Sequence, residues 1–295
     1  MIEIKSFISL DDSEISLVRD LETIVNRKDN LNSTISINSE YNIVSDLPTI
    51  YLLYLDHQLV SVLSIFMPKL TEVEISGFTH PDFRHQGYFS KLLDQFKTKI
   101  IKYGLIDLLF ICEYQSIEGV RFVQSLNANY EYSEYELTFN HHQFQSLPEI
   151  NSDIIVEVSS TKDLERLIEI YQHTFNIPTE ESRPMVMKTL NSERKTQFNA
   201  ILNDIIIGTC AVSLNVDSTY ILGVAIDTPY QSKGYGKVFL IKVIQELLKQ
   251  NINNLMIEVD SNNANAYQLY RHIGFDKRSE FQYYRLKMDQ VKEEE

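Results

Sequence analysis

A glycine-rich loop in the second half of the chain has residue types suited to binding an anion. The loop spans residues 231–237 (QSKGYGK) between an apolar, strand-like segment and an amphipathic, helix-like one. Glycines let the backbone approach a phosphate, and free N–H groups at a helix N-terminus point toward it with the helix dipole behind them. Gly234 and Gly236 could instead form a purely structural turn. The loop is neither a Walker loop nor a dinucleotide-binding G-x-G-x-x-G loop.

A second pattern follows this loop, and both patterns occur twice. The second pattern is Asn263-x-x-Ala266-x-x-Leu269-Tyr270-x-x-x-Gly274-Phe275. In the first half, Arg84, Gly87, Ser116 and Val123 stand 147 residues before Gln231, Gly234, Asn263 and Tyr270. Two chance matches need not keep the same spacing, so the chain is interpreted as a duplicated domain.

Each half has the same predicted order of elements around these patterns. Hydrophobic periodicity predicts strands at 2–7, 50–55, 59–67, 72–79, 107–112 and 132–139, and then at 154–158, 196–202, 205–214, 220–226, 255–259 and 281–288. Helices are predicted between them. The sequence therefore predicts an α/β fold of the α+β type, with two domains that are each a mixed, mostly antiparallel sheet flanked by helices. The domains are expected at 1–140 and 154–295, joined by a polar linker at 141–153.

Together, the two patterns resemble the motifs of the GNAT family of acyl-CoA N-acyltransferases. The loop resembles the family's pyrophosphate-binding motif, and Asn263 to Phe275 resembles the motif on the helix after the fifth strand. The resemblance covers residues 154–288, and the two halves together resemble bacterial tandem acetyltransferases. It implies an N-acetyltransferase that uses acetyl-CoA as co-substrate, without a metal, and acetylates a primary amine of a small molecule or peptide.

The resemblance also implies roles for individual residues. The backbone of Val224, Ala225 and Ile226 is expected to pair with the pantetheine arm, on a strand that bulges and diverges from the next strand. Asn263 is expected to bind the pantetheine region, and Tyr270 to protonate the leaving thiolate as a general acid. The pyrophosphate is expected to bind the main-chain N–H groups of Gln231, Ser232, Lys233, Gly234, Tyr235, Gly236 and Lys237.

Several of these residues have a simpler structural interpretation. Tyr270 could pack in the core with a satisfied hydroxyl, Asn263 could be a helix N-cap, and the Lys237 side chain could be solvated. Direct attack on the thioester also needs a base, because free amines are mostly protonated at neutral pH. Asp227 and Glu258 are the candidates, and either could equally be a strand-end surface residue. The identity of the acceptor has no motif in the sequence.

The first half has lost part of the pattern. Phe89 replaces the last small residue of the loop, and Val123 cannot transfer a proton, so this half is expected to lack the general acid. It could bind CoA without turnover or act as a scaffold. Two further alternatives are a CoA-binding or interaction module without catalysis, and activity in both halves. The candidate CoA-binding residues in this half are Arg84, Gln86, Gly87 and Tyr88.

Composition excludes several classes of protein. A net charge of −14 argues against nucleic acid or an anionic membrane as the main partner and is compatible with a cationic amine. No signal peptide or membrane-spanning run is present in the sequence. Cys112 and Cys210 are the only cysteines and both fall in predicted strands, which indicates reduced core residues and a cytoplasmic protein. The oligomeric state is not predicted.

Overall fold

The helices and strands of a computed structural model follow the predicted order along the chain. The structure describes residues 1–37, 42, 44–104, 107–148, 152–214 and 218–287. Residues 149–151 of the predicted linker, Met288 of the last predicted strand and the tail to residue 295 lie outside the described residues. The chain divides into unit 1, formed by Met1–Glu134 with Ser279–Glu295, and unit 2, formed by Tyr135–Arg278.

Unit 1 is a mixed sheet with helices on both faces. Its strand order is β1-β2-β3-β4-β5-β12, in which only the β4–β5 pair is parallel. Its complete elements are β1 (Ile2–Phe7), α1 (Asp12–Asp29), β2 (Ile50–Leu55), β3 (Gln58–Lys69), β4 (Glu72–Thr79), α2 (Tyr88–Ile100), β5 (Asp107–Glu113) and α3 (Ile117–Ser125).

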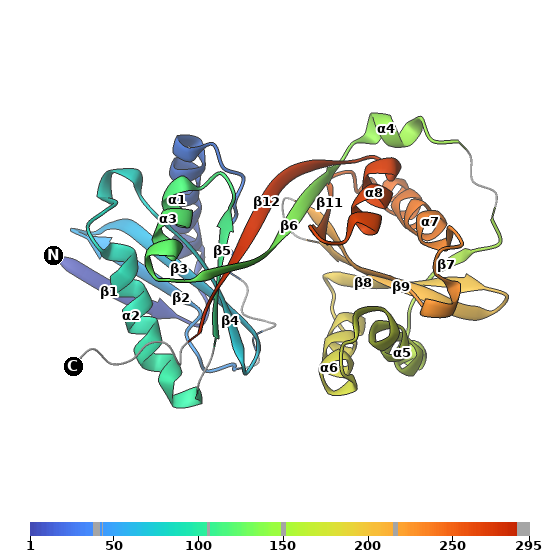
Figure 1. Cartoon of the computed structure of the whole chain (residues 1–295), viewed down its shortest axis with the longest axis horizontal. Coiled ribbons are helices and arrows are strands. Elements are labelled where there is room, and N and C mark those ends of the chain that lie inside the picture. The colour runs from blue at the N-terminus through green and yellow to red at the C-terminus, as the bar shows by residue number, and fades with distance from the viewer. Residues whose placement is uncertain (38–41, 43, 105–106, 149–151, 215–217, 288–295) are drawn as a thin grey trace. The chain divides into compact units, whose positions relative to one another are not determined.

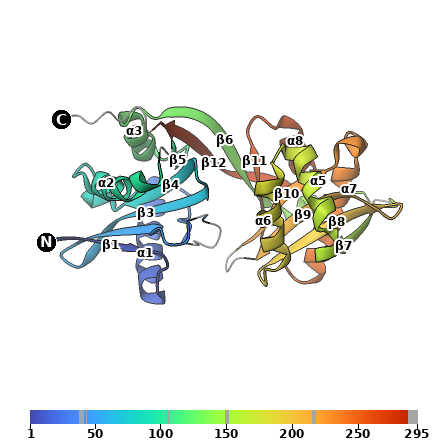
Figure 2. The same cartoon turned by 90° about the horizontal axis from the view of Figure 1, so that it is seen from below.

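Strand β2 shows why unit 1 needs helices on both faces. All but its last residue are buried, because alternate side chains point to opposite sides of a strand. Tyr51 and Leu53 pack in the core with α2, whereas Ile50, Leu52 and Tyr54 pack with α1. Figure 2 shows α1 and α2 on opposite sides of these strands.

Unit 2 repeats this arrangement. Its strand order is β6-β11-β10-β9-β8-β7, and β10 and β11 are parallel. Helices α5 and α6 cover one face of its sheet and α7 and α8 the other (Figure 1). Its complete elements are α4 (His141–Gln145), β7 (Ile155–Val158), α5 (Leu164–Phe175), α6 (Thr179–Leu190), β8 (Lys195–Leu202), β9 (Ile205–Leu214), β10 (Thr219–Ile226), α7 (Tyr235–Lys249), β11 (Leu255–Asp260) and α8 (Ala264–Ile273).

Two strands are longer than the sequence predicted and contribute to both units. β6 (Asn129–Phe139) and β12 (Phe275–Leu286) begin before the predicted starts at 132 and 281. The second part of β12 pairs with β5 from Phe281↔Glu113 to Leu286↔Leu108. Residues Phe281–Leu286 therefore extend the sheet of unit 1, although the predicted boundaries place them in the C-terminal domain. Residues 135–148 likewise belong to unit 2, where Phe144 of α4 is buried in the core.

The backbone repeats at the spacing found in the sequence. Left-handed φ angles are uncommon for residues other than glycine, so their positions mark special turns. Six pairs of left-handed residues are 147 residues apart: Asp56 and Asn203, His57 and Asp204, His85 and Ser232, Gly87 and Gly234, Gly104 and Asn251, and Asn127 and Gly274. The two halves therefore share their turns as well as their strand order. No helix within the described residues is both long and apolar enough to cross a membrane.

Candidate active site

The Gly234 loop (residues 231–237) has the geometry of an anion cradle. A short 3₁₀ turn follows β10, and Gly234 then caps α7 at φ +82° without any side-chain cap. Within the described chain, no hydrogen-bond partner occupies the backbone N–H groups of residues 232–237. A Cβ on Gly234 would meet no atom within 4 Å, so the cradle is open. Free N–H groups at an open helix N-terminus suit the pyrophosphate of acetyl-CoA.

The first residue of the loop fixes the loop to the end of the strand. The Gln231 side chain donates to the Ile226 carbonyl at 2.8 Å, and its own N–H donates to Thr228 at 3.3 Å. In unit 1, Arg84 Nε donates to the Thr79 carbonyl, again five residues earlier, at 3.2 Å. The side chains of both residues therefore hold the turn, and the free N–H groups begin at the next residue.

The two lysines of the Gly234 loop differ in their contacts. Lys233 Nζ donates to the Pro229 carbonyl at 2.9 Å and lies 5.6 Å from the centre of the Tyr230 ring. Lys237 is exposed on the first turn of α7. Both positive charges are in the loop region, where they favour an anionic ligand.

Strand β10 diverges from β11 next to this loop. Its last pair with β11 is Ile221↔Ile257, although β10 continues to Ile226. A bulge with Gly223 at φ +58° also interrupts its pairing with β9. The β11-facing edge of residues 224–226 is therefore left without a strand partner in the described structure. Such an edge can pair with an extended ligand arm.

Tyr270 lies on the buried face of α8 and is only 6% exposed. Burial raises the pKa of its hydroxyl, with a smaller contribution from Cys210, so the phenol keeps its proton at neutral pH. Its hydroxyl makes no hydrogen bond within the described part of the chain. Asn263 caps the same helix through its Oδ1, which accepts from the Ala266 N–H at 3.1 Å. These features suit a proton donor at Tyr270 and an exposed helix-capping residue at Asn263.

The two candidate bases differ in their surroundings. The Asp227 side chain is almost fully buried and contacts Arg166 and His173, the latter at 2.9 Å. Burial tends to raise the pKa of Asp227, but hydrogen bonds from His173 and Arg166 outweigh it and hold the pKa below the usual range. Such a paired carboxylate is a poor proton acceptor. Glu258 is exposed on β11, one residue beyond the last pair with β10.

A buried polar group beside the bulge was not identified from the sequence. The Tyr171 ring lies so close to Gly223 that a Cβ there would come within 3.1 Å of it. Its hydroxyl accepts from Gln197 Nε2 at 3.1 Å, and that amide also donates to Thr209 at 2.6 Å. Burial raises the pKa of Tyr171 to about 12. In the sequence this tyrosine is one apolar position of an amphipathic helix, which gives no sign of its neighbours.

In unit 1, the Gly87 loop (residues 84–90) has the same backbone but different side chains. Gly87 caps α2 at φ +75°, and β4 last pairs with β5 at Ile75↔Phe110. The β3–β4 register is regular through this region, so the bulge of β10 is missing. Tyr88 is buried in the core, and its hydroxyl donates to Gln86 at 3.1 Å.

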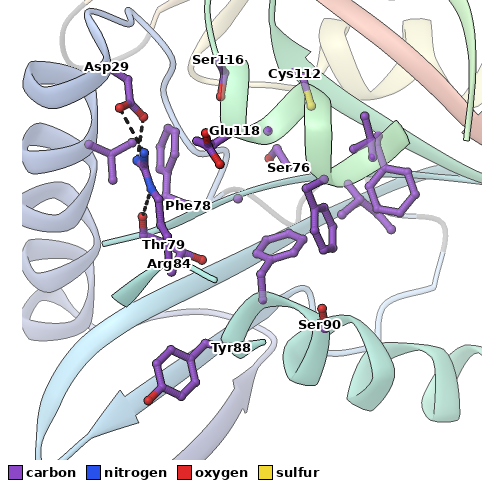
Figure 3. A pocket seen from close by; sticks show the side chains of 18 of the residues that line it. Asp29, Ser76, Phe78, Thr79, Arg84, Tyr88, Ser90, Cys112, Ser116 and Glu118 are labelled. Carbon is purple, nitrogen blue, oxygen red and sulfur yellow. Dashed lines mark hydrogen bonds and ion pairs between the residues drawn. The ribbon is translucent and has the colours of Figure 1, made fainter. Parts of the chain in front are cut away.

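The position equivalent to Tyr270 offers no proton in unit 1. Val123 is 2% exposed in the core, and Ser116 precedes α3 without capping it through its side chain. A cavity of about 300 Å³ lies beside these residues, between the ends of β4 and β5 and the Gly87 loop. Figure 3 shows Ser116, Cys112, Ser76 and Ser90 around it.

Comparisons with known proteins identify the family and the fold. A family model described as Acetyltransferase (GNAT) family matches residues 164–275. The ribosomal protein bS18-alanine N-acetyltransferase of Haemophilus influenzae is 32% identical over 115 residues, which cover 39% of this chain and 76% of that protein. A GCN5-related N-acetyltransferase from Sphaerobacter thermophilus has a similar fold, with a TM-score of 0.77 at 14% identity over 97% of this chain and 95% of that one. A tandem GNAT protein from the clavulanic acid biosynthesis pathway has a TM-score of 0.73 at 11% identity, over 97% of this chain and 98% of that one.

Proposed function

The chain belongs to the GNAT family of N-acetyltransferases, and from this premise we propose that unit 2 acetylates a primary amine of a small molecule or peptide. The observation that carries the proposal is the retention of three features in one unit. Unit 2 has the open Gly234 loop, the unpaired edge of β10 after the bulge, and a protonated tyrosine on α8. Unit 1 retains only the first of these in full.

Acetyl-CoA, the acetyl donor of the family, fits the residues present. The free N–H groups from Ser232 to Lys237 would hold the pyrophosphate, and the edge of Val224, Ala225 and Ile226 would pair with the pantetheine arm. Asn263 would donate its amide N–H to the same arm. Lys233 and Lys237 add positive charge beside the phosphates.

The chemical step that these residues support is direct transfer. The neutral acceptor nitrogen attacks the thioester carbonyl, the carbon–sulfur bond breaks, and the departing thiolate takes the proton of the Tyr270 hydroxyl. The tyrosine regains a proton from solvent, and the proton lost by the amine leaves through a base. Of the two candidates for that base, Asp227 is buried against Arg166 and His173, whereas Glu258 is exposed on β11, and we take Glu258 as the candidate.

A peptide acceptor should be tested first, because the name of the relative from Haemophilus influenzae gives an alanine of a ribosomal protein as its acceptor. A panel of amines would contain alanine-ended peptides and small polyamines, with thiol release from acetyl-CoA as the readout. Turnover with a peptide or a small amine would define the acceptor class. No turnover with any amine, together with tight CoA binding, would instead favour a binding module without catalysis.

The Tyr270→Phe variant tests the general acid. Removal of the proton donor should lower kcat by about 10²-fold or more, since general acid catalysis contributes ~10²–10⁴-fold, and KM for acetyl-CoA should change little. Tyr267→Phe is the matched control, because Tyr267 lies on the same helix and packs against Tyr135. An equal and small effect of both substitutions would exclude Tyr270 as the acid.

A further inference from the structure

The cavity of unit 1 is lined by five phenylalanines together with aliphatic and small polar residues. Its volume is about 300 Å³, at the lower end of the range of small-molecule sites. Two of its rings, Phe89 and Phe122, meet edge to face with centroids 5.1 Å apart. The phenyl rings of the lining belong to Phe78 of β4, Phe83 of the 3₁₀ turn before the Gly87 loop, Phe89 of α2, Phe110 of β5 and Phe122 of α3.

The cation of the Gly87 loop is already neutralised. Arg84 makes a two-pronged contact with Asp29 of α1, at 3.1 and 2.6 Å, while Nε donates to the Thr79 carbonyl (Figure 3). Both side chains of this ion pair are mostly buried. A phosphate would have to compete with an Asp29 carboxylate that already matches the planar guanidinium.

The remaining charges at the cavity are also paired. Glu118 of α3 lies 3.0 Å from Arg121 and 3.3 Å from His85 of the loop. In unit 2 the residue 147 positions after Glu118 is the neutral Asn265, and the loop there carries two lysines. A carboxylate beside the loop of unit 1 opposes the several negative charges of CoA.

Two equivalent positions near the glycine-rich loops carry residues of opposite size in the two units. Unit 1 has Gly77 on β4 and Phe89 on α2, whereas unit 2 has Val224 and Gly236 at the positions 147 residues later. A Cβ on Gly77 would come within 2.5 Å of the Phe89 ring, so the ring occupies the space directly over this glycine. In unit 2 the position of Phe89 is taken by Gly236, which has no side chain to fill the equivalent space.

We propose that unit 1 binds a small, uncharged molecule with a mainly apolar body and no phosphate group, in place of acyl-CoA. The phenyl rings offer apolar and edge-to-face contacts, and the paired ions leave no cation for a charged group. The hydroxyls of Ser76, Ser90 and Ser116 line the same cavity and supply hydrogen bonds to a polar atom of the ligand. The site is independent of the proposed acetyl transfer in unit 2.

The neutral fluorescent probe N-phenyl-1-naphthylamine tests this site on the full-length protein. The probe should bind saturably with one site per chain, and saturating CoA should not displace it. Failure to saturate, or displacement by CoA in a Gly234→Glu variant, would overturn the proposal. That variant removes the unit 2 loop as a source of competition.

Two variants reduce the cavity from different sides. Ser76→Phe fills it from β4, and Ser90→Phe fills it from the first turn of α2. Each should weaken probe binding about tenfold or more, a change that corresponds to the loss of about 1.4 kcal/mol of apolar contact. Thiol release by unit 2 should stay unchanged, and unchanged hydrogen exchange in residues 1–134 would show that unit 1 of each variant folds. Undiminished probe binding in both variants would contradict the assignment.

The stoichiometry of CoA binding, measured by titration calorimetry, gives the second arm of the test. The expected result is one CoA per chain, lost in Gly234→Glu and kept in Gly87→Glu. A second CoA that disappears in Gly87→Glu would show that unit 1 is a CoA site and overturn the proposal. Absence of CoA binding in the wild type would contradict the proposed function of unit 2, and the probe result would then decide the unit 1 site by itself.

Discussion

The Gly87 loop and the Gly234 loop have matching left-handed turns, yet their neighbouring side chains differ in size, charge and polarity. Gly87 and Gly234 have φ angles of +75° and +82°, and neither would meet an atom within 4 Å if it carried a Cβ. At equivalent positions nearby, unit 1 has Phe89 and Val123 where unit 2 has Gly236 and Tyr270. The backbone of a duplicated fold can therefore persist although the side chains around its loops differ.

The largest expected effect tests how β12 is shared between the units. Tyr284→Ala removes a side chain from the core of unit 1, and Phe275→Ala removes one from the core of unit 2. Each should lower the free energy of unfolding by about 3–5 kcal/mol, the usual cost of a buried aromatic truncation. Hydrogen exchange should increase mainly in residues 1–134 for the first variant and in residues 135–278 for the second. The opposite pattern would refute the assignment of Ser279–Leu286 to unit 1.

A residue of unit 1 can next be transferred into unit 2. Gly236→Phe introduces the residue that unit 1 has at position 89. Unit 2 has Val224 where unit 1 has Gly77, so the ring cannot lie over the strand as it does in unit 1. It must enter the slot between the diverging ends of β10 and β11. Displacement of the co-substrate should lower kcat/KM by about 10²-fold, the scale of a 1 Å misplacement. The matched Phe89→Gly variant should leave thiol release unchanged. Full activity of Gly236→Phe would mean that the slot does not hold the pantetheine arm.

The smallest expected effect concerns the contacts of Asp227 with Arg166 and His173, at the start of the 3₁₀ turn that follows β10. Asp227→Asn should lower the free energy of unfolding at pH 7 by about 2 kcal/mol, since hydrogen bonds to charged groups are worth ~1.5–3 kcal/mol. At the same position unit 1 has His80, which accepts from the Asp82 N–H. His80→Asn serves as the control and should have a weaker effect.

The pH dependence of this difference has a defined sign. The folded-state pKa of Asp227 is lowered, so its contribution is fully present above the unfolded value of about 3.9 and is lost as the pH falls through the lower folded value. Wild type and Asp227→Asn should therefore converge in stability below about pH 4. A difference that persists at acidic pH would show that the carboxylate charge is not its source.

Local patterns predicted most of the fold. A continuous apolar run at residues 50–55 and an alternating pattern at residues 72–79 both indicate strands, and the observed bounds agree. The loop could be predicted because Gly234 has a left-handed φ angle that favours glycine, and this requirement is local. Its use of free N–H groups follows from the same local geometry.

Relations between distant residues could not be predicted. The contact of Tyr171 with Gly223 joins elements far apart in the sequence, and the complementary sizes of Gly77 and Phe89 depend on how α2 packs on β4. The pairing of β12 with β5 could not be predicted either, because the sequence pattern of β12 is compatible with the sheet of unit 1 and with that of unit 2. The Asp227 contacts with Arg166 and His173 depend on how α5 packs, so the carboxylate resembled a free base in the sequence.

The central claim is that acetyl transfer occurs in unit 2 and not in unit 1. Steady-state thiol release from acetyl-CoA, compared between Gly234→Glu and Gly87→Glu, tests it most directly. The two substitutions place the same carboxylate at equivalent open positions with equivalent φ angles. Gly234→Glu should lower kcat/KM by about 10²-fold or more, because like charges placed together cost several kcal/mol, and Gly87→Glu should leave it unchanged. Equal losses, or a loss confined to Gly87→Glu, would contradict the claim.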